Sequence, residues 1–426
     1  MEYPQQFHVL IVGGGTCGLA LAHGLKGLEG VRCTVFERDS EEDYFNKTRD
    51  WGMMLHWGKD WLFRSLPPDL QDRFAETLCD PSYQGTQPIP HVNGQTGDVI
   101  STVEVPGLVR VSRKKLRNFL SSKRDLNIQF GKRLVSIATT AQNVTATFED
   151  GYQESSNLIV GCDGSRSKVR ELLVGRTLAR PVDTGMTIIN IAAACYTAEQ
   201  ALLMRKYHPI STCFYDPLVN GIFLLTILDA SDKDNPENWA LQVHHAWWGP
   251  PFAAELSDPK ARLQFFKDRS SRVCEPFSTA AAALPDDTII PVDAGQQWSP
   301  IPWNNRGGMV TIAGDAAHSM LPSKEPIQTY FISVSQTDLY LADRGQGLNN
   351  ALQDATELVG AIQSVVDGRL CSQEALDGYD KQMQFRGATD VALSLETAKN
   401  LVVSDLLESP MFKVGLQKME GKGIAV

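Results

Sequence analysis

Hydrophobic and polar positions change their spacing twice in the first forty residues, which predicts a strand, a turn, a helix and a second strand. Residues 7–12, FHVLIV, are a β-branched apolar run that stops at three consecutive glycines. From Leu19 to Leu25 the apolar residues recur with helical spacing. Residues 33–36 then form a short strand-like run that ends in Glu37. This order is typical of a βαβ unit in a parallel sheet.

The glycines between the first strand and the helix match the G-x-G-x-x-G pattern of dinucleotide-binding turns. Gly13 permits the tight turn, Gly15 lets the backbone approach a pyrophosphate, and Gly18 lets the helix pack on the strand. Glu37 lies 19 residues beyond Gly18, where an acid accepts hydrogen bonds from ribose hydroxyls and disfavours a 2′-phosphate. Arg38, the next residue, is a further cofactor-binding candidate.

The rest of the pattern predicts an α/β chain whose first domain is discontinuous. Loop-like sequence over 42–80 contains a strand at 51–55 and a helix near 57–64. Further strands and helices are expected at 109–112, 113–120, 134–140, 143–149, 158–160 and 309–313. Between about 186 and 290, strand-like runs separated by turn residues predict an antiparallel sheet. We therefore expect a Rossmann-like domain (1–80, 106–185, 291–372), an inserted sheet domain (81–105, 186–290) and C-terminal helices (373–426).

Composition and charge exclude several classes of protein. The 426 residues carry 40 Lys and Arg against 50 Asp and Glu, a net charge of −10, which disfavours nucleic acid as a partner. No apolar run approaches 18 residues, so a membrane span is not expected. The first residues lack the features of a signal peptide, which predicts a cytoplasmic protein. The eight cysteines form no C-x-x-C pair, so neither a metal site nor a disulfide framework is expected.

The predicted sheet region carries aromatic and imidazole side chains that are candidates for a substrate surface. His244 and His245 are adjacent in a strand and therefore point to opposite faces, so at most one of them can serve a given site. The aromatic residues are equally compatible with an ordinary core. They are Phe214, Tyr215, Phe223, Trp239, Trp247 and Trp248.

Three further motifs occur in a characteristic order. GCDGSRSKVR (161–170) and GDAAHSMLP (314–322) each follow a predicted strand, and GQGLNNALQDA (345–355) opens a helix. With the first glycine motif, they make the chain resemble the FAD-dependent, single-component (group A) monooxygenases of the aromatic-hydroxylase type. RDWG (49–52) and LHW (55–57) make it most similar to fungal secondary-metabolism members. The resemblance covers nearly the whole chain.

The resemblance implies a role for each motif. Asp163 and Gly164 would support the FAD pyrophosphate, Asp315 would bond the ribityl chain, and Arg113 would reach the ribityl–phosphate region. A helix start would aim its dipole at the flavin ring, where negative charge develops on reduction. The remaining implied cofactor residues are Gly52, Pro322, Gly345, Gly347, Leu348 and Asn349. Taken singly, Asp315 as an N-cap, Arg113 in an ion pair and Asp163-Gly164 as a turn are equally reasonable.

The implied reaction uses FAD, NADPH or NADH as a transient reductant, and dioxygen to hydroxylate a phenol-like aromatic molecule. Epoxidation of an isoprenoid or polyketide alkene is the next alternative, and a non-catalytic carrier on the same fold is a third. No general base stands out. His56, Tyr215 and His244 are the candidates for activating a phenol, and each is also compatible with a structural role.

One stretch departs from the family pattern. In the family, a G-x-G follows the proline of the GDAAH motif within two or three residues, whereas 21 residues (323–343) intervene here. The segment is either a lid loop or an unspliced short intron. Its residues can be encoded with splice donor, branch and acceptor sequences, and its removal in frame restores the family spacing. Sequencing the mature transcript distinguishes the two interpretations.

Overall fold

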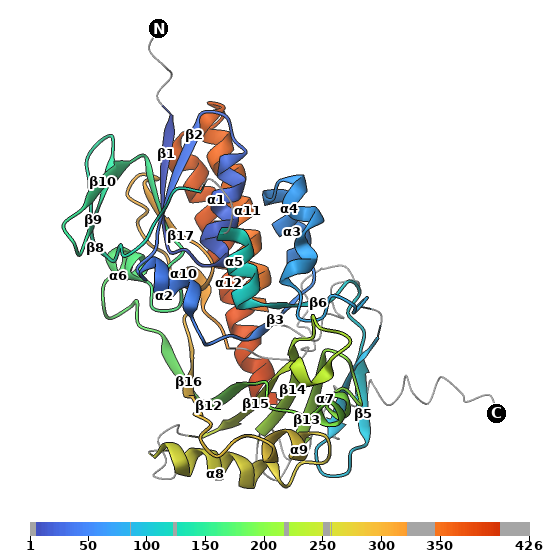
Figure 1. Cartoon of the computed structure of the whole chain (residues 1–426). Helices are drawn as coiled ribbons and strands as arrows, with labels where there is room; N and C mark the ends of the chain where they lie inside the picture. The colour runs from blue at the N-terminus through green and yellow to red at the C-terminus, as the bar shows by residue number, and fades with distance from the viewer. Residues whose placement is uncertain are drawn as a thin grey trace, which may run out of the picture.

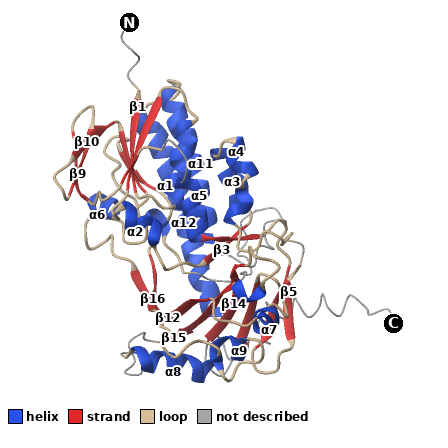
Figure 2. Ribbon diagram, viewed as in Figure 1, coloured by secondary structure: helices blue, strands red, loops and turns tan. Residues whose placement is uncertain are grey.

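The computed structural model describes residues 6–85, 87–121, 126–216, 221–249, 256, 258–321 and 346–400. Pro322, Gly345 and the segment 323–343 lie outside these residues. The described chain forms two sheet regions that Figures 1 and 2 show one above the other, with a long helix running between them.

A five-stranded parallel sheet organises the first region. Its order is β17-β11-β1-β2-β7, so the strand that opens the chain lies at the centre. Val9, Leu10 and Ile11 of that strand are fully buried, which explains the uninterrupted apolar run in the sequence. The strands are β1 (Phe7–Val12), β2 (Val31–Phe36), β7 (Ile128–Gln129), β11 (Leu158–Gly161) and β17 (Val310–Ile312).

Helices cover one face of this sheet, and a three-stranded antiparallel sheet packs on the other (Figure 1). The helices on the covered face are α1 (Thr16–Lys26), α5 (Arg113–Ser121), α11 (Gln346–Val366) and α12 (Ser372–Asn400), with α3 (Gly58–Ser65), α4 (Pro68–Asp72) and η1 (Phe74–Thr77) beside them. The small sheet contains β8 (Leu134–Thr139), β9 (Val144–Phe148) and β10 (Gln153–Ser156). Helices α6 (Lys168–Val174) and α10 (Asp315–His318) follow β11 and β17, at the carboxyl ends of the parallel strands.

A seven-stranded sheet forms the second region, in the order β16-β12-β15-β14-β13-β4-β5. All its pairs are antiparallel except that of β4 and β13. Its strands are β4 (Ile89–Asn93), β5 (Val99–Val103), β12 (Val182–Ala193), β13 (Ser211–Asp216), β14 (Gly221–Asp229), β15 (Ala240–Trp248) and β16 (Val292–Gln297). One face packs on α7 (Ala198–Met204), α8 (Pro259–Ser270) and α9 (Phe277–Ala282), with η2 (Pro236–Asn238) nearby. Strand β16 lies beyond residue 290, where we expected the inserted segment to end.

Helix α12 connects the two regions. Its 29 residues span about 43 Å at 1.5 Å per residue. Near its start, Asp380 accepts a hydrogen bond from the Thr311 hydroxyl in β17. Near its end, the carbonyl of Ala398 accepts a hydrogen bond from Trp248 Nε1 in β15, at 3.2 Å. Within the described ranges, no helix, α12 included, is long and apolar enough to cross a bilayer.

A two-stranded ribbon, β3 (Gly52–Leu55) and β6 (Val109–Ser112), also joins the regions. Arg110 of this ribbon donates hydrogen bonds of 2.8 Å to the Ile227 carbonyl and to the Gln242 side chain of the large sheet. The predicted elements at 109–112 and 113–120 are confirmed within one residue. The prediction of loop after residue 42 is wrong for α2 (Glu41–Asn46), since the Ser40 side chain caps that short helix through Asp43 N–H.

Candidate active site

The turn between β1 and α1 is shaped by two of the three motif glycines. Gly13 has a φ of +114°, and a Cβ there would lie 2.4 Å from the Cys162 carbonyl oxygen. A Cβ at Gly18 would lie 2.2 Å from the Gly13 carbonyl oxygen. Both positions therefore exclude a side chain because backbone from a neighbouring segment occupies the space. The predicted reasons for these two glycines are confirmed in the local geometry.

Gly15 differs because a Cβ there would meet nothing within 4 Å. Gly15 is the N-cap of α1, no side chain caps this helix end, and its first turn carries no acidic residue. The start of α1 thus combines free space at Gly15 with an uncapped, positive helix end, as an anionic group such as a pyrophosphate requires.

Glu37 lies against the same turn, at the end of β2. Its Oε2 accepts a hydrogen bond from Gly14 N–H at 2.9 Å, and its Oε1 accepts one from Asp39 N–H at 3.0 Å. A carboxylate offers about four acceptor sites, so capacity remains for two ribose hydroxyls. Arg38 is exposed. The geometry thus keeps an acceptor beside the glycine turn, as the sequence predicts.

The side chain of Asp163 accepts hydrogen bonds at the N-terminus of α6. It accepts hydrogen bonds from the Ser167 hydroxyl and from the N–H groups of Lys168 and Val169, at 2.6 and 3.2 Å for the latter two. Burial raises the pKa of this carboxyl, and those hydrogen bonds oppose the shift. Gly164, with a φ of +83°, borders open space. The local contacts are those of a helix cap, and the pyrophosphate contact stays a prediction.

Asp315 begins α10 and is exposed, although surrounding protein desolvates it enough to raise its pKa. The cationic groups of His318, Arg113 and Arg170 oppose that rise. A Cβ at Gly347, in the first turn of α11, would lie 3.7 Å from Asp315 Oδ1. The fold therefore brings the GDAAH motif and the start of the GQGLNN helix together.

Arg113 begins α5 and places its guanidinium 4.6 Å from the centre of the Trp51 ring. Burial and the neighbouring Arg117 lower its pKa, against the attraction of Asp315 and Asp50. Asp50 accepts hydrogen bonds from Lys114 N–H at 2.9 Å and from the Ser112 hydroxyl at 2.6 Å. The sequence did not suggest that Asp50 ties the RDWG loop to the start of α5.

Gly52 and Asn349 hold neighbouring segments in register. Gly52 N–H donates to Gln242 Oε1 at 2.8 Å, and a Cβ at Gly52 would lie 2.4 Å from Arg110 Nε. The fully buried Asn349 side chain accepts from His56 N–H and Gly58 N–H at 3.2 and 3.0 Å. Leu348, the residue before it, is half-buried. The side chain of Asn349 therefore connects α11 to the β3–α3 turn.

The catalytic candidates fall into two places. Tyr215 and His244 lie on the same face of the seven-stranded sheet, two strands apart, together with Leu224 and Ile222. His245 points to the opposite face, where it stacks on Phe223 with ring centres 4.0 Å apart. Burial and Arg269 hold its pKa well below the usual value, so it remains a neutral core residue.

His56 is buried in the β3–α3 turn, where its ring contacts Trp57 edge to face with centres 6.0 Å apart. His56 therefore belongs to a different element from Tyr215 and His244, which lie on strands of the large sheet. Across the described part of the chain, no group of three or more His, Cys, Asp or Glu side chains is placed to hold a metal ion.

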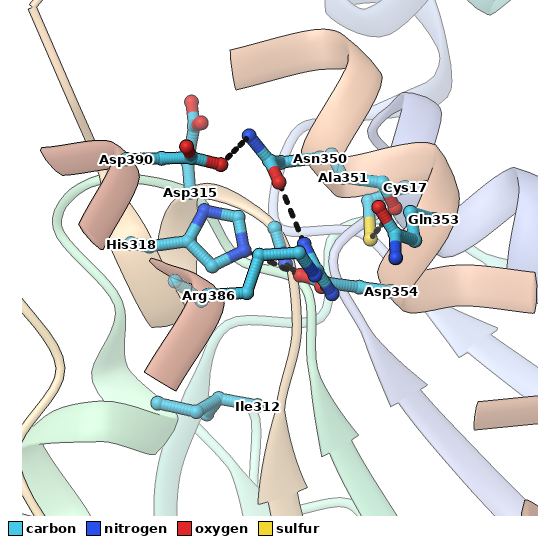
Figure 3. Close-up of polar contacts among 12 residues, drawn as sticks. Cys17, Ile312, Asp315, His318, Asn350, Ala351, Gln353, Asp354, Arg386 and Asp390 are labelled. Atoms are coloured by element: carbon cyan, nitrogen blue, oxygen red, sulfur yellow. Dashed lines mark hydrogen bonds and ion pairs between the residues drawn. The ribbon is translucent and has the colours of Figure 1, made fainter. Parts of the chain in front are cut away.

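A buried ionic cluster adjoins the turn that contains Asp315, and it was not predicted from the sequence. Asp354 of α11 bonds to His318 and to Arg386, which comes from α12 (Figure 3). Asp354 and His318 are both fully buried. The available signal was an aspartate within the apolar stripe of α11, between Ala351, Leu352 and Ala355.

Comparisons with known proteins agree with this geometry. The FAD binding domain family matches residues 110–324, which ends at the start of the 323–343 segment. The FAD-dependent monooxygenase phnB of Penicillium herquei is 31% identical over 429 residues, covering 98% of this chain and 96% of the relative. The chain belongs to the FAD-dependent monooxygenases. A second family member, cctM of Talaromyces islandicus, is 31% identical and covers 96% of this chain and 97% of the relative.

Solved structures of flavin-dependent monooxygenases share the fold. HpxO of Klebsiella pneumoniae, crystallised with FAD and uric acid, has a TM-score of 0.71 at 19% identity and covers 99% of this chain and 94% of its own. A salicylate hydroxylase in a substrate complex has a TM-score of 0.69 at 17% identity, with coverages of 98% and 93%. The predicted fold class and the FAD cofactor are confirmed.

The residues present fit the family's cofactor. The open space beside Gly15 and Gly164, the uncapped start of α1 and the spare acceptor capacity of Glu37 suit a dinucleotide. Asp315 supplies a carboxylate and Arg113 a cation on the side facing α10 and α11.

Proposed function

We propose that this monooxygenase hydroxylates a phenol-like aromatic molecule in fungal secondary metabolism, with NADPH or NADH as reductant. The balanced reaction takes one substrate C–H, dioxygen, a hydride from the nicotinamide nucleotide and a proton, and yields a hydroxylated product, water and the oxidised nucleotide. Bound FAD supplies the electron transfer and oxygen activation. The chain's own residues bind, orient and shield the reactants.

The placement of the candidate side chains carries this proposal. Tyr215 and His244 lie on one face of the large sheet, among apolar neighbours that include Met186, Ile188 and Leu321. This face is opposite the one covered by α8 and α9, and it receives the distal end of α12 through Ala398. The face also carries His91, whose ring contacts that of Tyr215 edge to face with centres 5.5 Å apart. An apolar surface with a phenol and imidazoles suits an aromatic ring bearing a hydroxyl.

Relatives of known name support an aromatic substrate. The 6-methylsalicylate 1-monooxygenase atA of Aspergillus terreus is 24% identical and covers 95% of this chain and 85% of the relative. We infer that His244 and Tyr215 orient the substrate hydroxyl, and that His244 accepts its proton through an imidazole nitrogen. We also infer that Gly13, Gly15, Gly18, Glu37, Asp163, Gly164, Arg113, Asp315, Gly347 and Asn349 form the walls of the FAD site.

The test is anaerobic mixing of the FAD-loaded protein with NADPH or NADH and a panel of phenols and prenylated aromatics. We expect a phenol that binds in the site to accelerate the reduction of FAD by the nucleotide, and hence bleaching of the flavin absorption band, by at least tenfold. Acceleration by alkenes but not by phenols would favour epoxidation instead. A colourless protein that takes up no FAD would favour the carrier alternative and contradict the proposal.

A further inference from the structure

Asp354 is a fully buried carboxylate that joins four elements of the fold. Its Oδ2 accepts hydrogen bonds from Gly314 N–H at 2.7 Å and from His318 Nε2 at 2.6 Å. Its Oδ1 accepts one from Arg386 Nη2 at 2.6 Å. Asp354 lies on α11, Gly314 on the β17–α10 turn, His318 on α10 and Arg386 on α12. One side chain therefore fixes these four segments relative to each other.

Arg386 reaches across α11 with both arms of its guanidinium, as Figure 3 shows. Nη2 also donates to Glu357 Oε2 at 3.0 Å, and Nη1 donates to Asn350 Oδ1 at 2.6 Å. The Asn350 amide in turn donates to Asp390, one turn further along α12, at 2.8 Å. Because the Arg386 guanidinium donates to three residues of α11, it defines the position of α12 along α11 as well as its distance.

The cluster is charged in the folded protein. Burial acts to raise the pKa of Asp354, but His318 and Arg386 outweigh it and lower that pKa to about 2. Burial acts to lower the pKa of His318, but the Asp354 carboxylate outweighs it and raises that pKa. An anion held between two cations makes strong hydrogen bonds, including the one to the Gly314 backbone.

The bond to Gly314 matters because that residue sets the direction of Asp315. Gly314 has a φ of +63° and is the N-cap of α10, and Asp315 is the first residue of that helix. A Cβ at Gly314 would lie 3.1 Å from Cys17 Sγ in α1 and 3.2 Å from Ala351 Cβ in α11. The turn is thus packed between the starts of two helices that border the cofactor site.

We propose that Asp354, His318 and Arg386 form a positioning cluster, through which α12 fixes the Gly314–Asp315 turn in the orientation that binds FAD. The inference rests on the proposed contact between FAD and Asp315. A purely structural cluster would only hold α11 and α12 together, whereas this proposal assigns the cluster an effect on FAD binding. Arg386 acts here through Asp354 and Gly314, so its role is positioning.

The test compares two variants that each remove hydrogen bonds made by α12: those of Arg386 to α11, and the one between Asp380 and Thr311 of β17. Arg386→Met removes the guanidinium and keeps an unbranched apolar stem. The matched control, Thr311→Val, removes the hydrogen bond to Asp380 and keeps the side-chain shape, three residues before Gly314. The readouts are the dissociation constant for FAD, the visible spectrum of bound FAD, and the melting temperature.

We expect Arg386→Met to raise the FAD dissociation constant at least tenfold and to alter the fine structure of the flavin band. Thr311→Val is expected to lower the melting temperature while keeping the dissociation constant within twofold of the wild type. Equal changes of FAD affinity in both variants, or wild-type affinity and spectrum in Arg386→Met, would overturn the proposal.

A second variant keeps the test decisive if Arg386→Met does not fold. Arg386→Lys keeps the charge but cannot bond Asp354, Asn350 and Glu357 at once. A threefold or larger rise in the FAD dissociation constant supports the positioning cluster, and an unchanged constant overturns it. Wild-type binding of FAD and product formation are measured separately, so a failure of the proposed function is distinguishable from a failure of this inference.

Discussion

Replacing Gly13 with alanine is expected to lower the free energy of unfolding by roughly 3 to 5 kcal/mol. The φ of +114° is strained for alanine, and the new Cβ would lie 2.4 Å from the Cys162 carbonyl oxygen and 2.9 Å from Asp163 Cα. Neither neighbour is a flexible side chain, so the β1–α1 turn or the β11–α6 turn has to move. Urea unfolding of the FAD-free protein, followed by tryptophan fluorescence, measures the loss.

Gly15→Ala is the matched control in the same turn, and it separates folding from cofactor binding. Gly15 has an extended backbone and open space around its Cβ position, so we expect a cost of about 1 kcal/mol or less in unfolding free energy. The added methyl occupies space that the pyrophosphate needs, so FAD affinity should fall at least tenfold. Gly15→Ala with wild-type affinity for FAD would contradict the placement of the cofactor.

Asp354→Ala is expected to destabilise the protein by about 3 to 5 kcal/mol, because it removes the buried carboxylate that pairs with both His318 and Arg386 and leaves Arg386 only Glu357 as an anionic partner. His318 and Arg386 lose their shared partner, and Gly314 N–H loses its acceptor. Asp354→Asn keeps the size of the side chain and one acceptor oxygen, so it should lose less. Equal losses in the two variants would show that packing, and not charge, is what Asp354 contributes.

The pH dependence of this effect has a definite sign. The pKa of Asp354 is about 2 in the folded protein, below its ordinary value of 3.8. Its contribution is therefore complete above about pH 4 and is lost as the pH falls toward 2. The pKa of His318 is raised in the folded protein. Protonated His318 therefore makes its full contribution to stability below about pH 6.5, and this contribution is lost as the pH rises through the raised pKa. The stability difference between wild type and Asp354→Asn should thus shrink below pH 4, and a constant difference would contradict the ion pairing.

Local pattern predicts the elements that carry the cofactor site. The glycine turn, β6, α5 and the β8–β9 hairpin were recoverable because each depends on a run of neighbouring residues. Alternation along β15 correctly assigned His244 and His245 to opposite faces of the sheet. Helix α2 was missed because its six residues lie in polar sequence, and only the Ser40 cap marks its start.

Side-chain contacts between distant segments were not predictable in the same way. The hydrogen bonds from backbone N–H groups of α6 to Asp163, and from those of the β3–α3 turn to Asn349, were not indicated by the sequence. The contact of these two residues with the cofactor stays a prediction. Arg386 lies in a long helix whose polar residues show no preferred face, so nothing local indicates which of them is buried. Its pairing with Asp354 depends on how α12 crosses α11, which only the folded chain defines.

The central claim is that this chain holds FAD and passes one oxygen atom of dioxygen to an aromatic substrate. The most direct measurement supplies the FAD-loaded protein with NADPH or NADH, isotopically labelled dioxygen and the phenol that accelerates flavin bleaching most, and analyses the product by mass spectrometry. We expect a hydroxylated product that carries one labelled oxygen for each nucleotide oxidised in a coupled turnover. A product without label, or reduced flavin whose electrons all pass to dioxygen and form hydrogen peroxide with every substrate in the panel, would contradict the claim.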